Sequence, residues 1–368
     1  MLRLSKVELG IKNGESDKMN KFLSEIICQP KSLEVTLDYY SSTEGEKRLK
    51  KIQELFHKEN FQQIIFTGMG SSFFTSYAAA CLFNSVGIHS FVVNTSELLY
   101  YHFALVTEKT LIVCISQSGE SFEVVKLLKK LPANIFCIGV TNEEKSTLSM
   151  TAKVSLLSKA GREEMTSTKT YTSISLVTFI LGWYLTGKWG QGKISQVKKL
   201  ITGFGELLTG HENLVKDIFD FLGDIKFLQF IGRGPSYSTV LQSELMFKEA
   251  AKVAAAGTLG GEFRHGPMEM VKPGFKSILF AAEGKTYNQS IKMAGDIAKY
   301  NGKVLIITNK DPKISDSNIN AILINQPDEY LYSIQSIIPV QLIVNHLALV
   351  KGFEPGNFVN GGKVTLME

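Results

Sequence analysis

Short apolar runs alternate with longer stretches of helical spacing along most of this sequence, beginning near residue 62. The short runs are rich in Val, Ile and Phe, which is typical of buried parallel strands. Between them, apolar residues recur every three or four positions, as in amphipathic helices. This alternation predicts an α/β fold in which helices cover both faces of parallel sheets. The predicted strands are 62–67, 89–93, 111–115, 134–140 and 153–157, then 227–231, 277–282, 304–308 and 321–325.

The same spacing predicts the helices and the division of the chain. Residues 1–60 are expected to be a helical lead-in, residues 61–192 and 193–350 two α/β domains, and residues 351–368 a tail. The lead-in helices are expected at 16–27, 31–40 and 46–57. One further helix is expected to begin at residue 72, and another, after the strand 111–115, to end at residue 130. The others are expected at 172–187, 193–222, 236–251, 285–300 and 328–349.

The second domain repeats motifs of the first. Phe66-Thr-Gly-Met-Gly-Ser-Ser-Phe73 matches Phe230-Ile-Gly-Arg-Gly-Pro-Ser-Tyr237, and both follow a predicted strand. Cys137-Ile-Gly-Val-Thr-Asn142 similarly matches Leu305-Ile-Ile-Thr-Asn309. These echoes indicate a duplicated α/β domain. Neither Gly-x-Gly pair continues to the third glycine of a dinucleotide fingerprint, so the motifs do not indicate an NAD site.

Composition narrows the class of protein. The 368 residues are 44% apolar and carry a net charge of +5, and the richest basic run, residues 47–51, lies on a predicted helix where a solvated face is expected rather than a nucleic-acid site. Three of the four cysteines (Cys28, Cys81, Cys114, Cys137) sit in apolar runs and no CxxC is present, which is typical of reduced core thiols. The start of the chain lacks a signal-peptide pattern, and the apolar stretch 174–185 is too short to span a bilayer. A cytoplasmic location, without membrane or nucleic-acid partners, is expected.

The most informative loop follows the predicted strand 111–115. It reads Ser116-Gln-Ser-Gly-Glu-Ser121 and opens into a helix pattern. Hydroxyl groups and backbone N–H groups gathered at a helix N-terminus favour an anion. The loop has no Walker lysine, so it suits one phosphate on a small molecule better than a nucleoside triphosphate. Taken alone, it could equally be an ordinary serine-capped helix start.

Five motifs in a fixed order supply the context. They are Gly68-x-Gly-Ser-Ser72, the loop at 116–121, Ser167-Thr-Lys-Thr170, Gly232-Arg-Gly234 and Glu262-Phe-Arg-His-Gly-Pro267. From about residue 61 onward the chain resembles the double-SIS (sugar isomerase) family. Within that family it is similar to the isomerase half of glucosamine-6-phosphate synthase and to stand-alone fructosamine-6-phosphate deglycases.

The resemblance implies two doubly wound, flavodoxin-like SIS domains, a homodimer, a sugar-phosphate ligand, and no metal or redox cofactor. Matching positions imply that the phosphate and nearby hydroxyls are bound by Ser71, Ser72, Ser116, Gln117, Ser118 and Ser121, with Ser167 lining the sugar. Glu249 matches the proton-transfer glutamate, and His265 matches a ring-opening histidine supplied by the other subunit. A carboxylate and a near-neutral imidazole suit proton transfer between C1 and C2 of a sugar and at its ring oxygen.

Without the motifs, each catalytic candidate has an ordinary reading. Glu249 beside Lys248 would be a solvated pair, His265 before Gly-Pro a turn residue, and Arg264 a surface charge. The motif context favours a catalytic role for Glu249 and His265. It does less for Arg264, which stays outside the catalytic set.

Three departures from the synthase pattern shape the functional prediction. No glutaminase is expected, because the lead-in spans only residues 1–60 and the sequence begins Met1-Leu2 without a terminal cysteine. Met246 stands where the synthase has a lysine. In the tail, the position of the synthase's Schiff-base lysine falls on Gly362, with Lys363 one place away; in an extended tail its side chain would point the other way.

These departures favour a deglycase, which converts a fructosamine 6-phosphate to glucose 6-phosphate and a free amine. Two alternatives stay open: a glucosamine-6-phosphate isomerase or deaminase, and a non-catalytic sugar-phosphate-binding regulator. The presence of both Glu249 and His265 favours an enzyme, and Lys363 remains a possible site residue.

Overall fold

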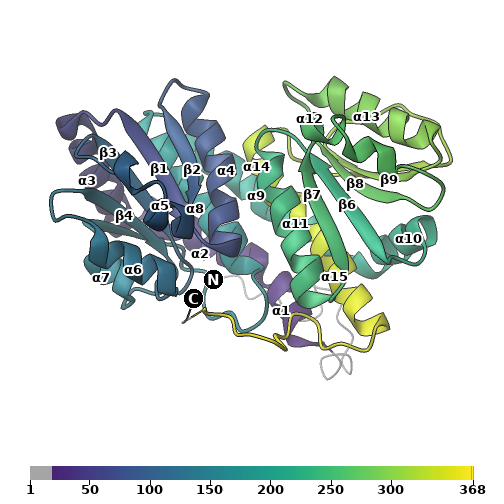
Figure 1. Ribbon diagram of the computed structural model, residues 1–368, viewed down its shortest axis with the longest axis horizontal. Helices are drawn as coiled ribbons and strands as arrows, with labels where there is room; N and C mark the ends of the chain where they lie inside the picture. Colours follow the sequence, from purple (N-terminus) through teal and green to yellow (C-terminus); the bar gives the residue numbers. More distant parts are fainter. Residues whose placement is uncertain (1–18, 366, 368) are drawn as a thin grey trace.

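The computed structural model describes residues 19–365 and 367 and contains two parallel five-stranded sheets, which lie in two lobes side by side (Figure 1). Every strand pairing in both sheets is parallel, as expected for strands joined by crossover helices. The first sheet contains β1 (Gln63–Gly68), β2 (Ser90–Asn94), β3 (Thr110–Ile115), β4 (Phe136–Thr141) and β5 (Val154–Leu157). The second contains β6 (Phe227–Gly232), β7 (Ala254–Leu259), β8 (Lys276–Ala281), β9 (Lys303–Thr308) and β10 (Ile319–Leu323).

Both sheets have the same strand order. The first runs β2-β1-β3-β4-β5, and the second, read from the corresponding edge, runs β7-β6-β8-β9-β10. This is the flavodoxin-like doubly wound order, in which ligands bind beyond the carboxyl ends of the strands where the order reverses. The predicted α/β fold class is therefore confirmed.

One strand was not predicted. The predicted strands do not include residues 254–259, whereas Ala254–Leu259 forms the edge strand β7 beside β6. Its sequence, Ala-Ala-Ala-Gly-Thr-Leu, is dominated by residues with low strand propensity. Pairing with β6 determines its conformation, which single-sequence propensity does not reveal.

Helices flank the sheets and form the lead-in. The predicted helices at 31–40 and 46–57 are observed with slightly wider bounds, and the predicted start near Ser16 lies outside the described residues. The lead-in contains α1 (Lys21–Ile27), α2 (Gln29–Ser41) and α3 (Thr43–Glu59). The first lobe adds α4 (Gly70–Asn84), α5 (Thr95–Tyr100), η1 (Phe103–Leu105), α6 (Phe122–Lys130), α7 (Thr147–Thr151) and α8 (Lys169–Leu185). The remainder contains α9 (Gln191–Leu208), α10 (His211–Leu222), α11 (Ser236–Ala250), α12 (Gly260–Phe263), η2 (Pro267–Met270), α13 (Tyr287–Lys299), α14 (Glu329–Gln335) and α15 (Ile337–Val350).

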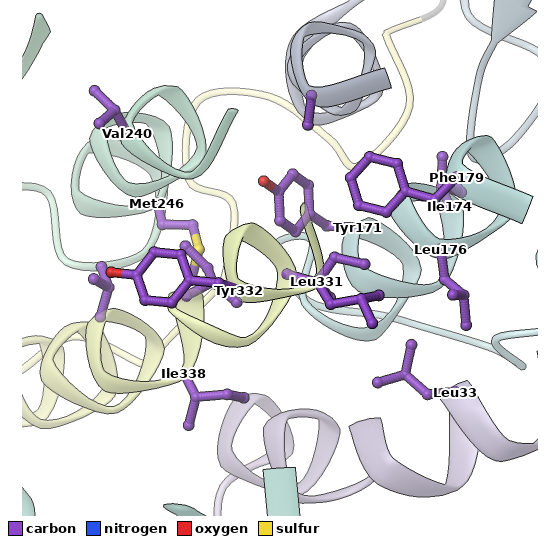
Figure 2. Packing of buried hydrophobic residues seen from close by; sticks show 14 of the residues in the cluster. Leu33, Tyr171, Ile174, Leu176, Phe179, Val240, Met246, Leu331, Tyr332 and Ile338 are labelled. Carbon is purple, nitrogen blue, oxygen red and sulfur yellow. The ribbon is translucent and has the colours of Figure 1, made fainter. Parts of the chain in front are cut away.

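The two lobes share a buried apolar core in which α8, α11, α14 and α15 meet (Figure 2). Met246 of α11 is fully buried there, in the same apolar cluster as Tyr332 of α14 (Figure 2). The departure at Met246 thus places an apolar side chain in the core. It also fixes the rotation of α11, so that Leu245 and Glu249, one helical turn apart, face the first lobe.

The predicted helix 328–349 is broken at Ser336 into α14 and α15. Pro339 lacks the N–H that would bond to the carbonyl of Gln335, so a continuous helix cannot pass this point unperturbed. The combined segment Glu329–Val350 is the one described stretch long and apolar enough to cross a membrane, but 83% of its most apolar window is buried inside the molecule. Its apolar surface is therefore accounted for by the core between the lobes.

The four cysteines are free thiols, of which Cys114 and Cys137 are buried and Cys28 is exposed. Burial raises the pKa of Cys137 to about 12, which keeps that thiol protonated near neutral pH. The prediction of reduced core thiols thus holds for Cys114 and Cys137, and Cys81 is partly buried.

Candidate functional site

A cavity of about 160 Å³ lies at the carboxyl end of the first sheet, between the loops of that sheet, α11 and the tail. Its walls come from segments distant in sequence, and the tail reaches it by passing from the second lobe to the first (Figure 1). The lining residues are Met69, Gly70, Ser71, Ser72, Gln117, Ser118, Ser121, Ser167, Leu245, Glu249, Phe358, Gly362, Lys363 and Thr365.

The loop after β3 forms the polar wall of this cavity. Ser116 is buried directly behind the wall, where its Oγ accepts a hydrogen bond from the N–H of Gly119 at 3.1 Å and lies 3.3 Å from Oγ of Ser121. Gly119 has φ of +67°, and a Cβ there would lie 2.1 Å from Oγ of Ser146. Only glycine therefore permits this tight turn. The turn leaves the hydroxyls of Ser118 and Ser121 at the cavity.

The loop after β1 is joined to this wall by Ser72. The Oγ of Ser72 accepts a hydrogen bond from the N–H of Gln117 at 3.2 Å. Ser121 begins α6 without using its hydroxyl as a helix cap, so the hydroxyl remains directed toward Ser116 and the cavity. Serine hydroxyls around the N-terminus of a helix form an environment that favours an anion such as phosphate.

Glu249 lies on the opposite wall, in the last turn of α11. Burial raises the pKa of its carboxyl, while a hydrogen bond from the hydroxyl of Thr166 and the charges of Lys363 and Lys252 act in the opposite direction. The net direction is upward. A carboxylate with a raised pKa, close to hydroxyl-rich surface in a cavity, has the properties of a general acid–base group.

Lys363, a possible site residue from the sequence, reaches the cavity, although the expectation for an extended tail was that its side chain would point the other way. Its Nζ lies 2.7 Å from Oε2 of Glu163 and 2.6 Å from the carbonyl oxygen of Met165. The expectation assumed an extended tail with alternating side chains. The tail instead bends at residues 359–361 and again at 363–364, so both Gly362 and Lys363 line the cavity.

Hydrogen bonds attach the tail to both lobes. The N–H of Phe122, at the start of α6, donates to the carbonyl of Thr365 at 3.0 Å, and the N–H of Thr166 donates to Gly356 at 3.0 Å. From the second lobe, Nζ of Lys252 donates to the carbonyl of Asn357 at 2.7 Å. The tail is therefore a structural part of the cavity.

Of the predicted site residues, Ser116 lies behind the cavity wall, and His265 lies outside the cavity. His265 is exposed in the turn between α12 and η2, and its N–H donates to the carbonyl of Glu262 at 2.9 Å. The neighbouring Arg264 pairs with Asp296 at 2.6 Å. One chain thus brings together Ser71, Ser72, Gln117, Ser118, Ser121, Ser167, Glu249 and Lys363, with Ser116 behind them, and leaves His265 apart.

Three polar residues of the site were not predicted: Thr166, Thr365 and Glu163. Thr166 adjoins the Ser167-Thr-Lys-Thr170 motif, which was a usable signal. Glu163 lies in Arg162-Glu163-Glu164, a run that resembles solvated surface, yet its side chain is fully buried. Within residues 19–365 and 367, no group of three or more His, Cys, Asp or Glu side chains is placed to hold a metal ion.

The model of the SIS domain matches this chain twice, over residues 55–182 and 222–351. The chain belongs to the SIS domain family. Among curated relatives, the glutamine–fructose-6-phosphate aminotransferase (isomerizing) of Pyrococcus horikoshii is 30% identical over 352 residues, which cover 94% of this chain and 57% of that protein. The chain therefore spans little more than half the length of this relative.

Two solved structures show the same fold. The C-terminal domain of glucosamine-fructose-6-phosphate aminotransferase from Francisella tularensis has a TM-score of 0.81 and 23% identity, and the match covers 94% of this chain and all of that one. Glucosamine-6-phosphate deaminase from Thermotoga maritima has a TM-score of 0.71 and 18% identity, with coverage of 94% and 100%. Two SIS domains in one chain, as the resemblance implied, are thus confirmed.

Proposed function

We propose that this SIS protein is a phosphosugar-processing enzyme that cleaves a fructosamine 6-phosphate to glucose 6-phosphate and a free amine. The observation that carries the proposal is the shared cavity of Glu249 and the serine loop after β3. The serines would hold the phosphate, and this remote contact would orient the other end of the sugar toward Glu249.

The reaction requires one carboxylate and one water molecule. Glu249 removes a proton from C1 of the open-chain ketose, the electrons of that C–H bond form a C1–C2 double bond, and the C2 oxygen gains a proton. Return of a proton to C2 produces an imine between C1 and the nitrogen. Water adds to C1, and the C–N bond breaks as the amine leaves with a proton. Glu249 is regenerated in its starting state.

The ion pair of Lys363 supports a substrate that carries its own nitrogen. An ammonium group held 2.7 Å from a buried carboxylate has no free lone pair with which to attack a carbonyl carbon. The proposed reaction needs no such lysine adduct, because the substrate nitrogen already forms the imine.

A second candidate is deamination or isomerisation of glucosamine 6-phosphate. It is favoured by the fold shared with the Thermotoga maritima deaminase over its whole length, and it would use the same carboxylate. A coupled assay for glucose 6-phosphate release from a panel of fructosamine 6-phosphates, with glucosamine 6-phosphate in parallel, tests both. Release from an amino-acid conjugate supports the deglycase. Turnover of glucosamine 6-phosphate alone, or binding without turnover, contradicts it, and the latter would favour the regulator.

We also propose that the enzyme is a homodimer in which His265 of one copy completes the site of the other. The support is that His265 is exposed and lies outside the cavity of its own chain. Mixing inactive Glu249→Gln and His265→Ala proteins after subunit exchange should restore about a quarter of wild-type activity, since half the dimers are hybrids with one intact site. Absence of recovery in verified hybrids would contradict shared sites.

A further inference from the structure

The buried Glu163 has no part in the proposed reaction, yet it is the most fully satisfied carboxylate near the cavity. Its Oε1 accepts hydrogen bonds from the N–H groups of Thr168 at 2.9 Å and Thr170 at 3.1 Å, at the start of α8. Its Oε2 accepts from the hydroxyl of Thr170 at 2.5 Å and from Nζ of Lys363 at 2.7 Å. A solvent-exposed serine would be enough for capping α8, so burial of a charge here calls for another role.

The partner cation connects Glu163 to the cavity. The side chain of Lys363 is 20% exposed and is gripped by Glu163 and the carbonyl of Met165, while the same residue lines the cavity with Glu249. Burial opposes ionisation of Glu163, but the charge and hydrogen bond of Lys363, together with bonds from Thr170, lower its pKa. The Glu163 carboxyl is therefore ionised near neutral pH.

We propose that Glu163 is a positioning residue that fixes the ammonium of Lys363 in the cavity wall and thereby holds the tail closed and sets the charge around Glu249. The proposal rests on the function proposed above for that cavity. Lys363 is tied on one side to a residue of the first lobe and belongs on the other to the tail, so the ion pair joins the two segments. Among the described residues, loss of the carboxylate would leave the carbonyl of Met165 as the remaining hydrogen-bond partner of Lys363.

Other charged groups facing this region are few. Glu249 is faced by Lys363 from the tail and by Lys252 from the end of α11, and both lower its pKa against the larger, opposite effect of burial. Lys363 also faces Glu25 of α1, whose carboxylate accepts the N–H of Glu164 at 2.6 Å and whose pKa is raised by burial and by Glu163. If Lys363 is released to solvent, its charge lowers the pKa of Glu249 less, so the effect of burial raises that pKa further. The acidic limb of the pH–rate profile should then move to higher pH.

The test uses the single variants E163Q and K363M, the neutral double variant E163Q/K363M, and a matched control. The control is E164Q, which breaks the neighbouring Lys21–Glu164 pair of the same 2.7 Å length but with side chains 66% and 40% exposed. E163Q should reduce kcat by roughly tenfold to a hundredfold through misplacement of the tail, with its acidic limb at higher pH. The double variant should give the same kcat and profile, and E164Q should match wild type.

Amide hydrogen exchange separates this proposal from the proposed function. The N–H of Phe122, which donates to Thr365, and that of Thr166, which donates to Gly356, report tail closure without any substrate. Both should exchange faster in E163Q and E163Q/K363M but not in E164Q. If wild type turns over no sugar while this pattern holds, the function fails and the positioning role stands. A folded E163Q variant with the same amide exchange and pH–rate profile as wild type would overturn the positioning role. Additive effects of E163Q and K363M on kcat would also overturn it.

Discussion

The two sheets of this chain share one strand order, but the loops after their third strands differ in nearly every side chain. After β3 the loop carries three serines and the sharply turned Gly119. After β8 it reads Ala282-Glu-Gly-Lys-Thr286, and its Glu283 pairs with Lys310 at 2.6 Å. The carboxyl end of a doubly wound sheet is thus a place where a site can form, and side chains decide whether it does.

A carboxylate of the chain itself lies beside the loop after β8, which we call the second loop. The carboxylate of Glu329, at the start of α14, lies against Gly284, where an added Cβ would approach it to 2.8 Å. The space next to the second loop is therefore filled by part of the chain, whereas the first loop borders a cavity. The second lobe contributes instead through α11, which carries Glu249 to the first lobe's cavity. The first lobe supplies the serine-lined wall of the cavity, and the second lobe supplies the carboxylate of Glu249.

The largest predicted effect is the loss of turnover when the Glu249 carboxylate is removed from α11. Glu249→Gln keeps the shape of the side chain but cannot accept a proton, so turnover should fall by roughly two to four orders of magnitude. Phosphosugar affinity, measured by calorimetry, should stay close to wild type because the serine loop is untouched. Turnover within a few-fold of wild type would remove Glu249 from the mechanism.

The second largest effect is expected from glycine-to-alanine substitutions, which the loops after β3 and β8 should tolerate differently. Gly119→Ala places a Cβ at positive φ and against Ser146, and should destabilise the protein by about 2–4 kcal/mol. Gly284→Ala meets only the mobile end of Glu329, without positive φ, and should cost less. Urea unfolding of both variants measures the difference. Equal losses would mean that the first turn is no tighter than the second.

The residues that begin α6 and α13 allow a matched comparison of binding. Ser121 precedes α6 beside the cavity, and Thr286 precedes α13 away from it; neither side chain caps its helix. Ser121→Ala should weaken phosphosugar binding by about tenfold, as expected for a lost hydrogen bond to a charged ligand. Thr286→Ala should leave the affinity unchanged. Similar losses in both variants would indicate that the second loop also binds the ligand.

The smallest predicted effect concerns pH. Because burial raises the pKa of Glu249, and a base must be ionised, kcat/KM should fall with decreasing pH at values above the ordinary glutamate pKa of about 4.3. The exposed Glu283 of the second loop serves as the control, since Glu283→Gln should leave the profile unchanged. A profile that stays flat down to the ordinary glutamate range would contradict the assignment of Glu249 as the base.

Sequence alone predicted nine of the ten described strands and most of the residues that line the cavity, for physical reasons. Buried strands are continuous apolar runs, and the serine loop combines hydroxyls, a turn glycine and a helix start in one short segment. The edge strand β7 was missed because its alanines and glycine carry little strand preference. The break before α15 was missed although Pro339 marks it.

The remaining misses depend on tertiary contacts. Glu163 resembles a surface charge until the tail covers it, and the direction of Lys363 depends on bends that its glycine-rich neighbourhood permits but does not specify. No local pattern links two residues that are 200 positions apart. Such pairs become visible only when both lobes and the tail are in place.

That separation has a consequence for how the protein becomes active. Contacts between residues far apart in sequence form slowly, because a long loop must close before they contribute. Lys363 and Thr365 leave the ribosome long after the first lobe has emerged. Helix α6 can therefore fold before Thr365, whose carbonyl accepts the N–H of Phe122, has been synthesised. The serine loop can therefore be in place well before the cavity is complete. Newly made chains should pass through a folded but inactive stage that ends when the tail docks.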